Sequence, residues 1–155
     1  MLPIVITFMP SVLGRVVFEA EVLTADRLTL DTVTFKLDTG SDFTTLSCKA
    51  LASLGYTDEI LSTCSIYGTA TTGGGNVLLQ YIDNVSIKFG DREIQGCRVF
   101  FALGTKLSSL FGSDILKHFT YTVDNELCEF RMSATKRVVT TQAGDPQIQI
   151  YSLDQ

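Results

Sequence analysis

Basic residues are scarce in this 155-residue chain, and its cysteines are not closely spaced. Twelve Lys and Arg stand against 17 Asp and Glu, so the formal net charge is −5 and no basic face is available to collect phosphates. The short cysteine spacings of zinc sites are missing from the four cysteines, Cys48, Cys64, Cys97 and Cys128. We therefore expect no nucleic-acid partner, no metal site, and free thiols in a reducing compartment.

Long apolar runs and an N-terminal basic segment are also missing. No apolar run approaches the roughly 20 residues that a membrane-spanning helix needs. The first basic residue is Arg15, so the chain lacks the positive region of a secretory signal peptide. These absences predict a cytoplasmic protein with no membrane partner.

Histidine is represented by one residue, His118. Because the sequence also lacks a Gly-x-Ser-x-Gly motif, a serine-hydrolase triad has little support. We interpret His118 as a structural or exposed residue of a short helix.

Hydrophobic and strand-forming residues dominate the composition. The hydrophobic fraction is 45% and only three prolines interrupt the chain, which fits one domain with a single core. Alternating apolar and polar residues predict strands at 33–37 and 85–89, and an apolar run predicts a strand buried on both faces at 94–102. Hairpin turns are predicted at Gly90-Asp91 and at Asp124-Asn125, the latter leading into a strand at 127–132. The sequence therefore predicts an all-β fold.

Two short helices interrupt this pattern. Ser47 can cap the first helix, with Ala50, Leu51 and Leu54 facing the core and Gly55 ending it. The second begins at Ser113 or Asp114 and continues through Phe119, so Asp114 is interpreted as a helix-start residue.

A polar turn follows the strand at 33–37. The sequence Asp38-Thr39-Gly40-Ser41 stands at the end of this apolar strand, and Leu110-Phe111-Gly112 later leads into the second helix. Asp-Thr-Gly alone could be an ordinary β-turn, with residues chosen for backbone reasons. The strand, the second motif and their spacing together favour an active site.

The order of these features resembles the retropepsin-like aspartic proteases, the single-lobe, retroviral-type enzymes, over roughly residues 15 to 132. The resemblance implies a closed acid-protease barrel with a β-hairpin flap, one or two short helices and a symmetric homodimer. We expect a cellular or bacterial member of this family.

The resemblance also implies roles for the polar turn. Asp38 matches the catalytic aspartate, and Thr39 matches the threonine whose hydroxyl crosses to the opposing loop. Gly40 matches the position where the substrate and a backbone amide approach the carboxylate, so that a side chain would be an obstruction. Ser41 has a hydroxyl that can hydrogen-bond the aspartate and favour its charged form.

Further matches lie beside and beneath this turn. Asp42 matches an acidic residue that binds the substrate main chain. Leu110, Phe111 and Gly112, with the helix after them, match the segment that packs under the catalytic loop. In viral members an arginine usually follows this glycine, but here the residue is Ser113. Because that arginine pairs with the acidic residue in those members, the sequence assigns no partner to Asp42.

A long hairpin is predicted between the two motifs. Residues 64–70 and 76–82 flank Thr71-Thr72-Gly73-Gly74-Gly75, a pliable tip suited to a flap that closes over a peptide. We expect Thr71, Thr72, Gly73 and Gly74 to bind substrate. The glycine run is equally compatible with a plain loop.

The chain offers one Asp-Thr-Gly, whereas the chemistry of this family uses two carboxylates. Two copies of Asp38 would therefore meet across a two-fold axis and activate a water between them, without metal or cofactor. The predicted function is a homodimeric aspartic endopeptidase acting on peptides or proteins. The alternative is a catalytically inactive retropepsin-fold module that dimerises and binds peptides.

The C-terminal part changes character after residue 132. We predict a protease domain at 1–132 and an extension at 133–155, in which the turn signal Ala143-Gly144-Asp145-Pro146 precedes the alternating Ile148 and Ile150. The extension is either an added hairpin, which could form a strand pair at a dimer interface, or a flexible segment. Pro3–Phe8 and Ile148–Tyr151 are candidates for an interface sheet between two chains.

Overall fold

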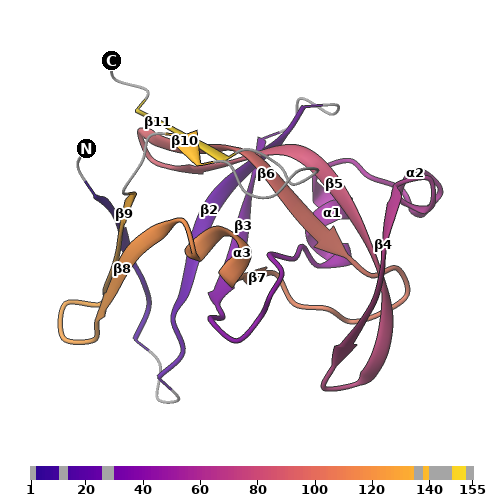
Figure 1. The fold of residues 1–155 in the computed structure, drawn as a ribbon, viewed down its shortest axis with the longest axis horizontal. Coiled ribbons are helices and arrows are strands. Elements are labelled where there is room, and N and C mark those ends of the chain that lie inside the picture. Colours follow the sequence, from indigo (N-terminus) through magenta and orange to yellow (C-terminus); the bar gives the residue numbers. More distant parts are fainter. Residues whose placement is uncertain (1–2, 11–13, 26–29, 135–137, 140–147, 153–155) are drawn as a thin grey trace.

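Two β-sheets and three short helices make up the described part of the chain (Figure 1). The computed structural model describes residues 3–10, 14–25, 30–134, 138–139 and 148–152. The predicted turn at 143–146 lies outside these residues.

The smaller sheet contains three antiparallel strands in the order β1-β9-β8. These strands are β1 (Ile4–Thr7), β8 (Phe119–Asp124) and β9 (Glu129–Ala134). Their inner face buries Ile4 and Ile6 of β1 with Phe130 and Met132 of β9. The period-two alternation of apolar residues thus places one side of the sheet on the core.

The larger sheet follows the order β10-β11-β6-β5-β2-β3-β7, and β4 pairs with β5 beside this path. Its strands are β2 (Val17–Thr24), β3 (Leu30–Leu37), β4 (Ser65–Thr72), β5 (Gly75–Phe89), β6 (Arg92–Phe101), β7 (Leu110–Phe111), β10 (Val138–Val139) and β11 (Ile148–Ser152). The predicted strands at 33–37 and 85–89 fall within it, and the one predicted at 94–102 corresponds to β6, which ends one residue earlier. Their inward residues, such as Val33, Phe35, Val85 and Ile87, are buried.

The first predicted helix is confirmed as α1 (Cys48–Ser53). The Ser47 hydroxyl accepts a hydrogen bond of 3.1 Å from the Ala50 N–H, and Gly55 follows the helix with φ +96°. The next helix, α2 (Asp58–Ser62), was not predicted. Thr57 caps it by accepting from the Ile60 N–H at 3.2 Å.

The second predicted helix is shorter than expected. It is α3 (Ser113–Leu116), and its N-cap is Gly112 with no side-chain hydrogen bond. The expectation that the helix continues through Phe119 is wrong, because Phe119 begins β8 and pairs with Ala134. His118 therefore lies between the helix and the strand, where it is buried.

Both predicted hairpins are present, but one turn is longer than expected. Gly90-Asp91 joins β5 to β6 as predicted. After Asp124 the chain makes a wider turn, in which the Asp124 carboxylate accepts from the N–H groups of Glu126 and Leu127 at 3.0 Å. The following strand therefore begins at Glu129, and Leu127 is 62% exposed.

An aromatic cluster joins the two sheets. The ring of Phe18 in β2 lies 6.0 Å from Phe35, 6.1 Å from Phe89, 5.5 Å from Phe111 and 6.0 Å from Phe130, measured between ring centroids. Phe130 belongs to the smaller sheet, whereas the others belong to the larger one. Phe18 thus connects the layers within the core.

The structure shows a mostly β fold, and the strand pairings of the described residues do not close either sheet into a barrel. Backbone pairing places β11 antiparallel to β6, so part of the predicted extension adds a strand to the larger sheet. The division at residue 132 and a role of the termini in an interface stay predictions. Among the described helices, none is long and apolar enough to cross a membrane.

The Phe18 cluster gives a first test. Replacing Phe18 by Ala removes a buried ring with four aromatic neighbours, and we expect the free energy of unfolding to fall by about 3–5 kcal/mol. Urea denaturation followed by circular dichroism measures this change. Leu127→Ala, at an exposed apolar position, should stay within about 0.5 kcal/mol of the wild type. Equal losses in the two variants would contradict the role of Phe18.

Candidate active site

Parallel pairing of β3 with β7 brings the two sequence motifs together. Lys36 lies beside Leu110 and Leu37 beside Phe111, and the Asp38 N–H donates to the Phe111 carbonyl at 3.0 Å. The Asp-Thr-Gly turn therefore begins where the strand pair ends.

The Asp38 side chain is held by its own turn. Its Oδ1 accepts a hydrogen bond of 3.1 Å from the Gly40 N–H, and the Ser41 N–H donates to the Asp38 carbonyl at 3.2 Å. A Cβ added at Gly40 would lie 3.5 Å from this Oδ1, which is an ordinary contact. A side chain at position 40 would therefore fit in the single chain. That a substrate comes too close for a side chain there stays a prediction.

The expectation that the Ser41 hydroxyl bonds to Asp38 is wrong. Ser41 Oγ instead donates to the Phe43 carbonyl at 2.8 Å and accepts from the Phe43 N–H at 3.3 Å. The hydroxyl thus closes a local turn within the loop and supports its shape.

Gly112 lies directly against this loop. A Cβ at Gly112 would collide with the Phe43 carbonyl oxygen and come within 2.9 Å of the Ser41 carbonyl oxygen. The Ser113 N–H donates to that Ser41 carbonyl at 2.8 Å. Gly112 therefore packs directly against the backbone of the loop, and glycine is required there by the closeness of the two backbones.

A second support, which sequence reasoning missed, joins Thr44 to Asp114. Asp114 Oδ2 accepts from the Thr44 N–H at 2.9 Å and Oδ1 from the Thr44 hydroxyl at 2.6 Å, while the Gly112 N–H donates to the same hydroxyl at 3.0 Å. Asp114 also accepts from the Ile115 N–H at 2.9 Å, as expected for a helix-start residue. Nothing local in the sequence shows its partnership with Thr44, 70 residues away.

Burial governs the protonation of Asp114. Desolvation raises the pKa of its carboxyl above the usual range. The hydrogen bonds from Thr44 and Ile115 and the charge of Lys117 lower it, but they do not reverse the direction.

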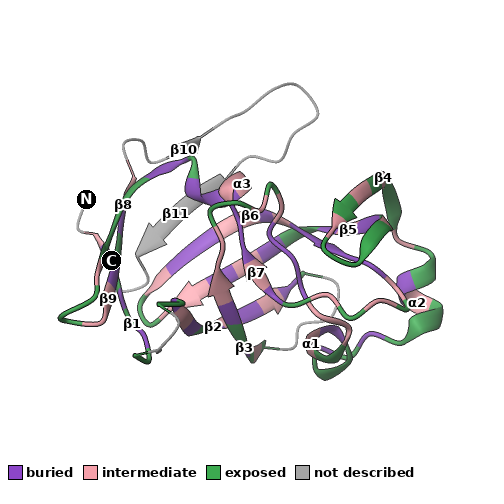
Figure 2. Cartoon of the chain, turned by 90° about the horizontal axis from the view of Figure 1, so that it is seen from below, coloured by how far each residue is buried: buried purple, intermediate pink, exposed green. Residues whose placement is uncertain are grey.

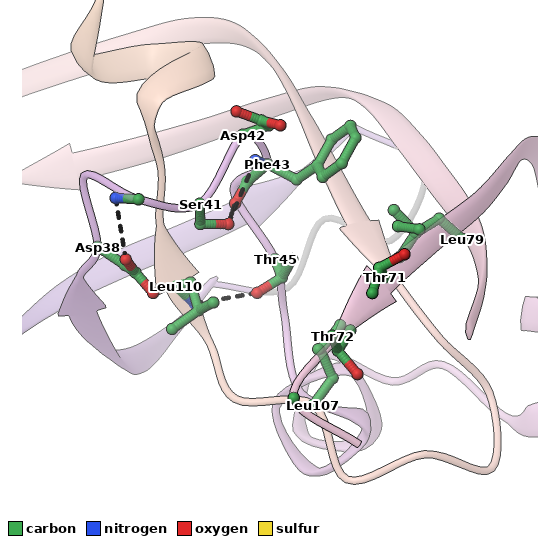
Figure 3. Close-up of a pocket in the computed structure, with 13 residues that line it drawn as sticks. Asp38, Ser41, Asp42, Phe43, Thr45, Thr71, Thr72, Leu79, Leu107 and Leu110 are labelled. Carbon is green, nitrogen blue, oxygen red and sulfur yellow. Dashed lines mark hydrogen bonds between the residues drawn. The ribbon is translucent and has the colours of Figure 1, made fainter. Parts of the chain in front are cut away.

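A cleft of about 370 Å³ opens between the Asp38 loop and the β4–β5 hairpin. Figure 3 shows Asp38, Ser41 and Asp42 on one side, and Thr71, Thr72 and Leu107 on the other. The cleft is lined by Asp38, Gly40, Ser41, Asp42, Phe43, Thr45, Ala70, Thr71, Thr72, Gly73, Leu79, Leu107 and Leu110. Seven of the residues proposed for catalysis, loop support or substrate binding thus line one cavity, together with Leu110 of the underlying motif.

Other expected residues lie outside the lining. Thr39 and Gly74 are exposed and do not contribute to it, whereas Phe111 and Gly112 are buried beneath the loop. Sequence reasoning missed the apolar lining residues Phe43, Ala70, Leu79 and Leu107, and also Thr45. Alternation along β5 could have suggested Leu79, but the others depend on how distant segments meet.

The hairpin over the cleft is formed by β4 and β5, with Gly73 and Gly74 at its turn. The Thr72 hydroxyl donates to the Gly75 carbonyl at 3.0 Å and accepts from the Gly74 N–H at 3.2 Å. The outer part of the hairpin is largely exposed (Figure 2). The glycine run is thus the tip of a hairpin rather than a plain loop.

An aromatic wall connects this hairpin to the loop. The Phe43 ring lies 5.2 Å from Tyr67 and 4.7 Å from Phe100, and Tyr67 lies 5.3 Å from Phe100. Tyr67 stands at an irregularity of β4 between Ile66 and Gly68, and such bulges redirect a side chain. Phe43 therefore contributes its backbone to the loop and its ring to the hairpin.

The charges of the cleft are of one sign. Asp38 and Asp42 are its only charged lining residues. Within the described ranges, no group of three His, Cys, Asp or Glu side chains is arranged to hold a metal ion.

Comparison with known proteins agrees with this geometry. The sequence profile of a family described as aspartyl protease matches residues 24–115, a range that contains both Asp38 and Gly112. The chain therefore belongs to the aspartyl protease family.

A solved structure supports the same assignment at the level of the fold. A retropepsin-like aspartic protease from Rickettsia conorii superposes with a TM-score of 0.58 at 21% sequence identity, covering 85% of this chain and 92% of that one. The fold is thus of the retropepsin-like kind. No curated protein sequence matches the chain.

The contact beneath the loop can be tested at Gly112. We expect Gly112→Ala to lower the free energy of unfolding by about 3 kcal/mol, because the added methyl group meets backbone atoms that cannot rotate away. Gly73→Ala is the matched control, since a Cβ there has no neighbour within 4 Å. Chemical denaturation of both variants makes the comparison, and a Gly112→Ala protein as stable as the control would refute the steric argument.

Asp114 predicts a pH dependence. Because the pKa of Asp114 is raised, the folded protein binds this proton more tightly than the unfolded chain does. The stability that protonated Asp114 contributes is therefore full below about pH 3.8, the ordinary value, and is lost as pH rises through the raised pKa. We expect the unfolding free energy of the wild type, relative to Asp114→Asn, to fall over this window by at most about 1.4 kcal/mol per pH unit. Urea titrations from pH 3 to pH 7 measure it. A relative stability that rises with pH would reverse the assigned direction.

Proposed function

We propose that the protein is an aspartic endopeptidase that cleaves peptide bonds with a water activated between two Asp38 carboxylates. The observation that carries this proposal is the position of Asp38, at the end of β3, held by the Gly40 N–H and lining a cleft beneath a hairpin. Membership of the aspartyl protease family supports it.

Two chains complete the site. Aspartic peptidase chemistry uses two carboxylates, and the sequence holds one Asp-Thr-Gly. A symmetric homodimer places the second Asp38 across a two-fold axis, so that one site forms from two identical loops. Thr39 is exposed in the single chain and is therefore free to bond to the opposing loop.

The reaction follows from this pair of carboxyl groups. Because two like charges in contact repel, one Asp38 is ionised while the other keeps its proton. The ionised carboxylate takes a proton from the water, whose oxygen bonds to the carbonyl carbon, and the protonated carboxyl donates to the carbonyl oxygen. The tetrahedral intermediate then breaks its carbon–nitrogen bond as the first carboxyl gives the proton it took from the water to the leaving nitrogen. One hydroxyl of the intermediate returns its proton to the second carboxylate, which restores the starting pair.

The remaining groups bind and enclose the substrate. An extended peptide lies between the loop and the hairpin, with Gly40 and Asp42 beneath it and Thr71, Thr72, Gly73 and Gly74 above it. Closure of the hairpin excludes bulk water from the reaction.

Asp38→Asn tests the chemistry. We expect cleavage of a peptide library between pH 3 and pH 7 to fall at least about 1,000-fold, because the amide cannot act as a base. Asp91→Asn, at an exposed turn, is the charge-matched control and should retain activity. Cleavage by Asp38→Asn at the wild-type rate would refute the role of Asp38. Peptide binding without cleavage by the wild type would favour the inactive binding module.

The same variant tests the shared site. If the site is shared by a dimer, wild-type chains mixed with an equal amount of Asp38→Asn chain form mixed pairs, which lack one of the two carboxylates. We expect the total activity to fall to about one half when exchange is complete. If each chain were active alone, the addition would leave the total activity unchanged. Mass photometry on the same mixtures reports the dimer directly.

A further inference from the structure

We propose that the cleft selects peptides carrying a lysine or arginine near the cleaved bond, and that Asp42 is the residue that selects them. This inference rests on the proposed peptidase function and adds a substrate class to it.

The first argument is the charge of the lining. Of the 13 residues that line the cleft, two are carboxylates and none is Lys, Arg or His. Lys106, which precedes the lining residue Leu107, does not contribute to the surface. Such a cleft attracts cationic peptides and repels acidic ones, both on approach and when bound.

The second argument is that Asp42 is unpaired. Its side chain is exposed, and within the described part of the chain it has no hydrogen bond or ion pair. The neighbouring groups are already engaged, since the Ser41 hydroxyl and the Phe43 backbone bond to each other and the Thr44 N–H donates to Asp114. Asp42 therefore presents a carboxylate that nothing on its own loop neutralises.

The position after Gly112 strengthens this argument. That position holds Ser113, whose N–H donates to the Ser41 carbonyl at 2.8 Å. The loop is thus held by the backbone of residue 113, and this position supplies no cation to Asp42. A cation in the substrate is free to pair with it.

The reach of the loop limits where the cation lies. Asp42 follows Asp38 by four residues, so their backbones are at most roughly 14 Å apart. An extended peptide advances about 3.3 Å per residue, which places the selected side chain within about four residues of the cleaved bond. In the proposed homodimer the two-fold axis gives one Asp42 on each side, so the preference holds both before and after that bond.

The experiment moves a single charged residue along a cleavable peptide, one position at a time. Starting from a neutral peptide that the wild type cleaves, Lys, Gln or Glu is placed in turn at each of the four positions on either side of the cleaved bond, and kcat/KM is measured. An exposed ion pair changes affinity by up to about fivefold, and a like-charge contact opposes binding similarly. We expect Lys to exceed Glu about tenfold at the best position, with a smaller ratio in 0.5 M salt.

Asp42→Asn should reduce this Lys-to-Glu ratio to about two, whereas the charge-matched control Asp91→Asn should keep it near ten. If Asp42 binds only the substrate main chain, its loss lowers kcat/KM for all peptides by the same factor and the ratio is unchanged, which overturns the inference and leaves the peptidase function intact. Equal cleavage of Lys and Glu peptides by the wild type also overturns it.

A separate measurement distinguishes failure of this inference from failure of the proposed function. If the wild type cleaves no peptide, the peptidase proposal fails, and the same labelled peptides are titrated against the protein by fluorescence anisotropy. Tighter binding of Lys than of Glu peptides, lost in Asp42→Asn, supports the selection by Asp42. Equal binding of the two overturns it.

Discussion

The close contact between Gly112 and the Phe43 carbonyl is the constraint on which the candidate site depends. It lets β7 lie parallel to the end of β3, so that Asp38 is held by the Phe111 carbonyl from below and by its own turn from the side. A side chain at 112 would push the loop outward and open the floor of the cleft. The Thr44–Asp114 bonds complete the same junction from the other side. Two stretches of chain, residues 36–44 and 110–114, are thus joined at the loop that carries Asp38.

Much of this arrangement could be predicted from local patterns. The alternation at Val33 and Phe35 gives the strand that delivers Asp38, and the Ser47 cap gives α1, because both patterns act within one element. The glycine run gives the hairpin tip at Gly73. Gly112 could be placed beneath the loop only through the family resemblance, since its close contact joins segments far apart in the sequence.

The rest depended on tertiary contacts that no single segment encodes. The Ser41 hydroxyl, expected to bond to Asp38, donates its hydrogen bond to the Phe43 carbonyl two residues further along the turn. The aromatic wall of Phe43, Tyr67 and Phe100 arises from an irregularity in β4 that redirects one side chain. Helix α2 is only five residues long, too short to leave a clear periodic signal. The helix expected through Phe119 ended early because β8 pairing with β9 prevailed over helical propensity.

The pairing of β3 with β7 also has a consequence for the order of folding. Thr44 and Asp114, which lie beside that pairing, are 70 residues apart. Closing this contact therefore costs the conformational entropy of a long loop before its hydrogen bonds can stabilise the junction. The hairpins of the sheets, in contrast, close over a few residues. During synthesis, a chain that has not yet added residues 110–114 has no floor for its Asp38 loop. By this argument the cleft forms after the hairpins, and a chain truncated before residue 110 carries the Asp-Thr-Gly sequence without the cavity that surrounds it.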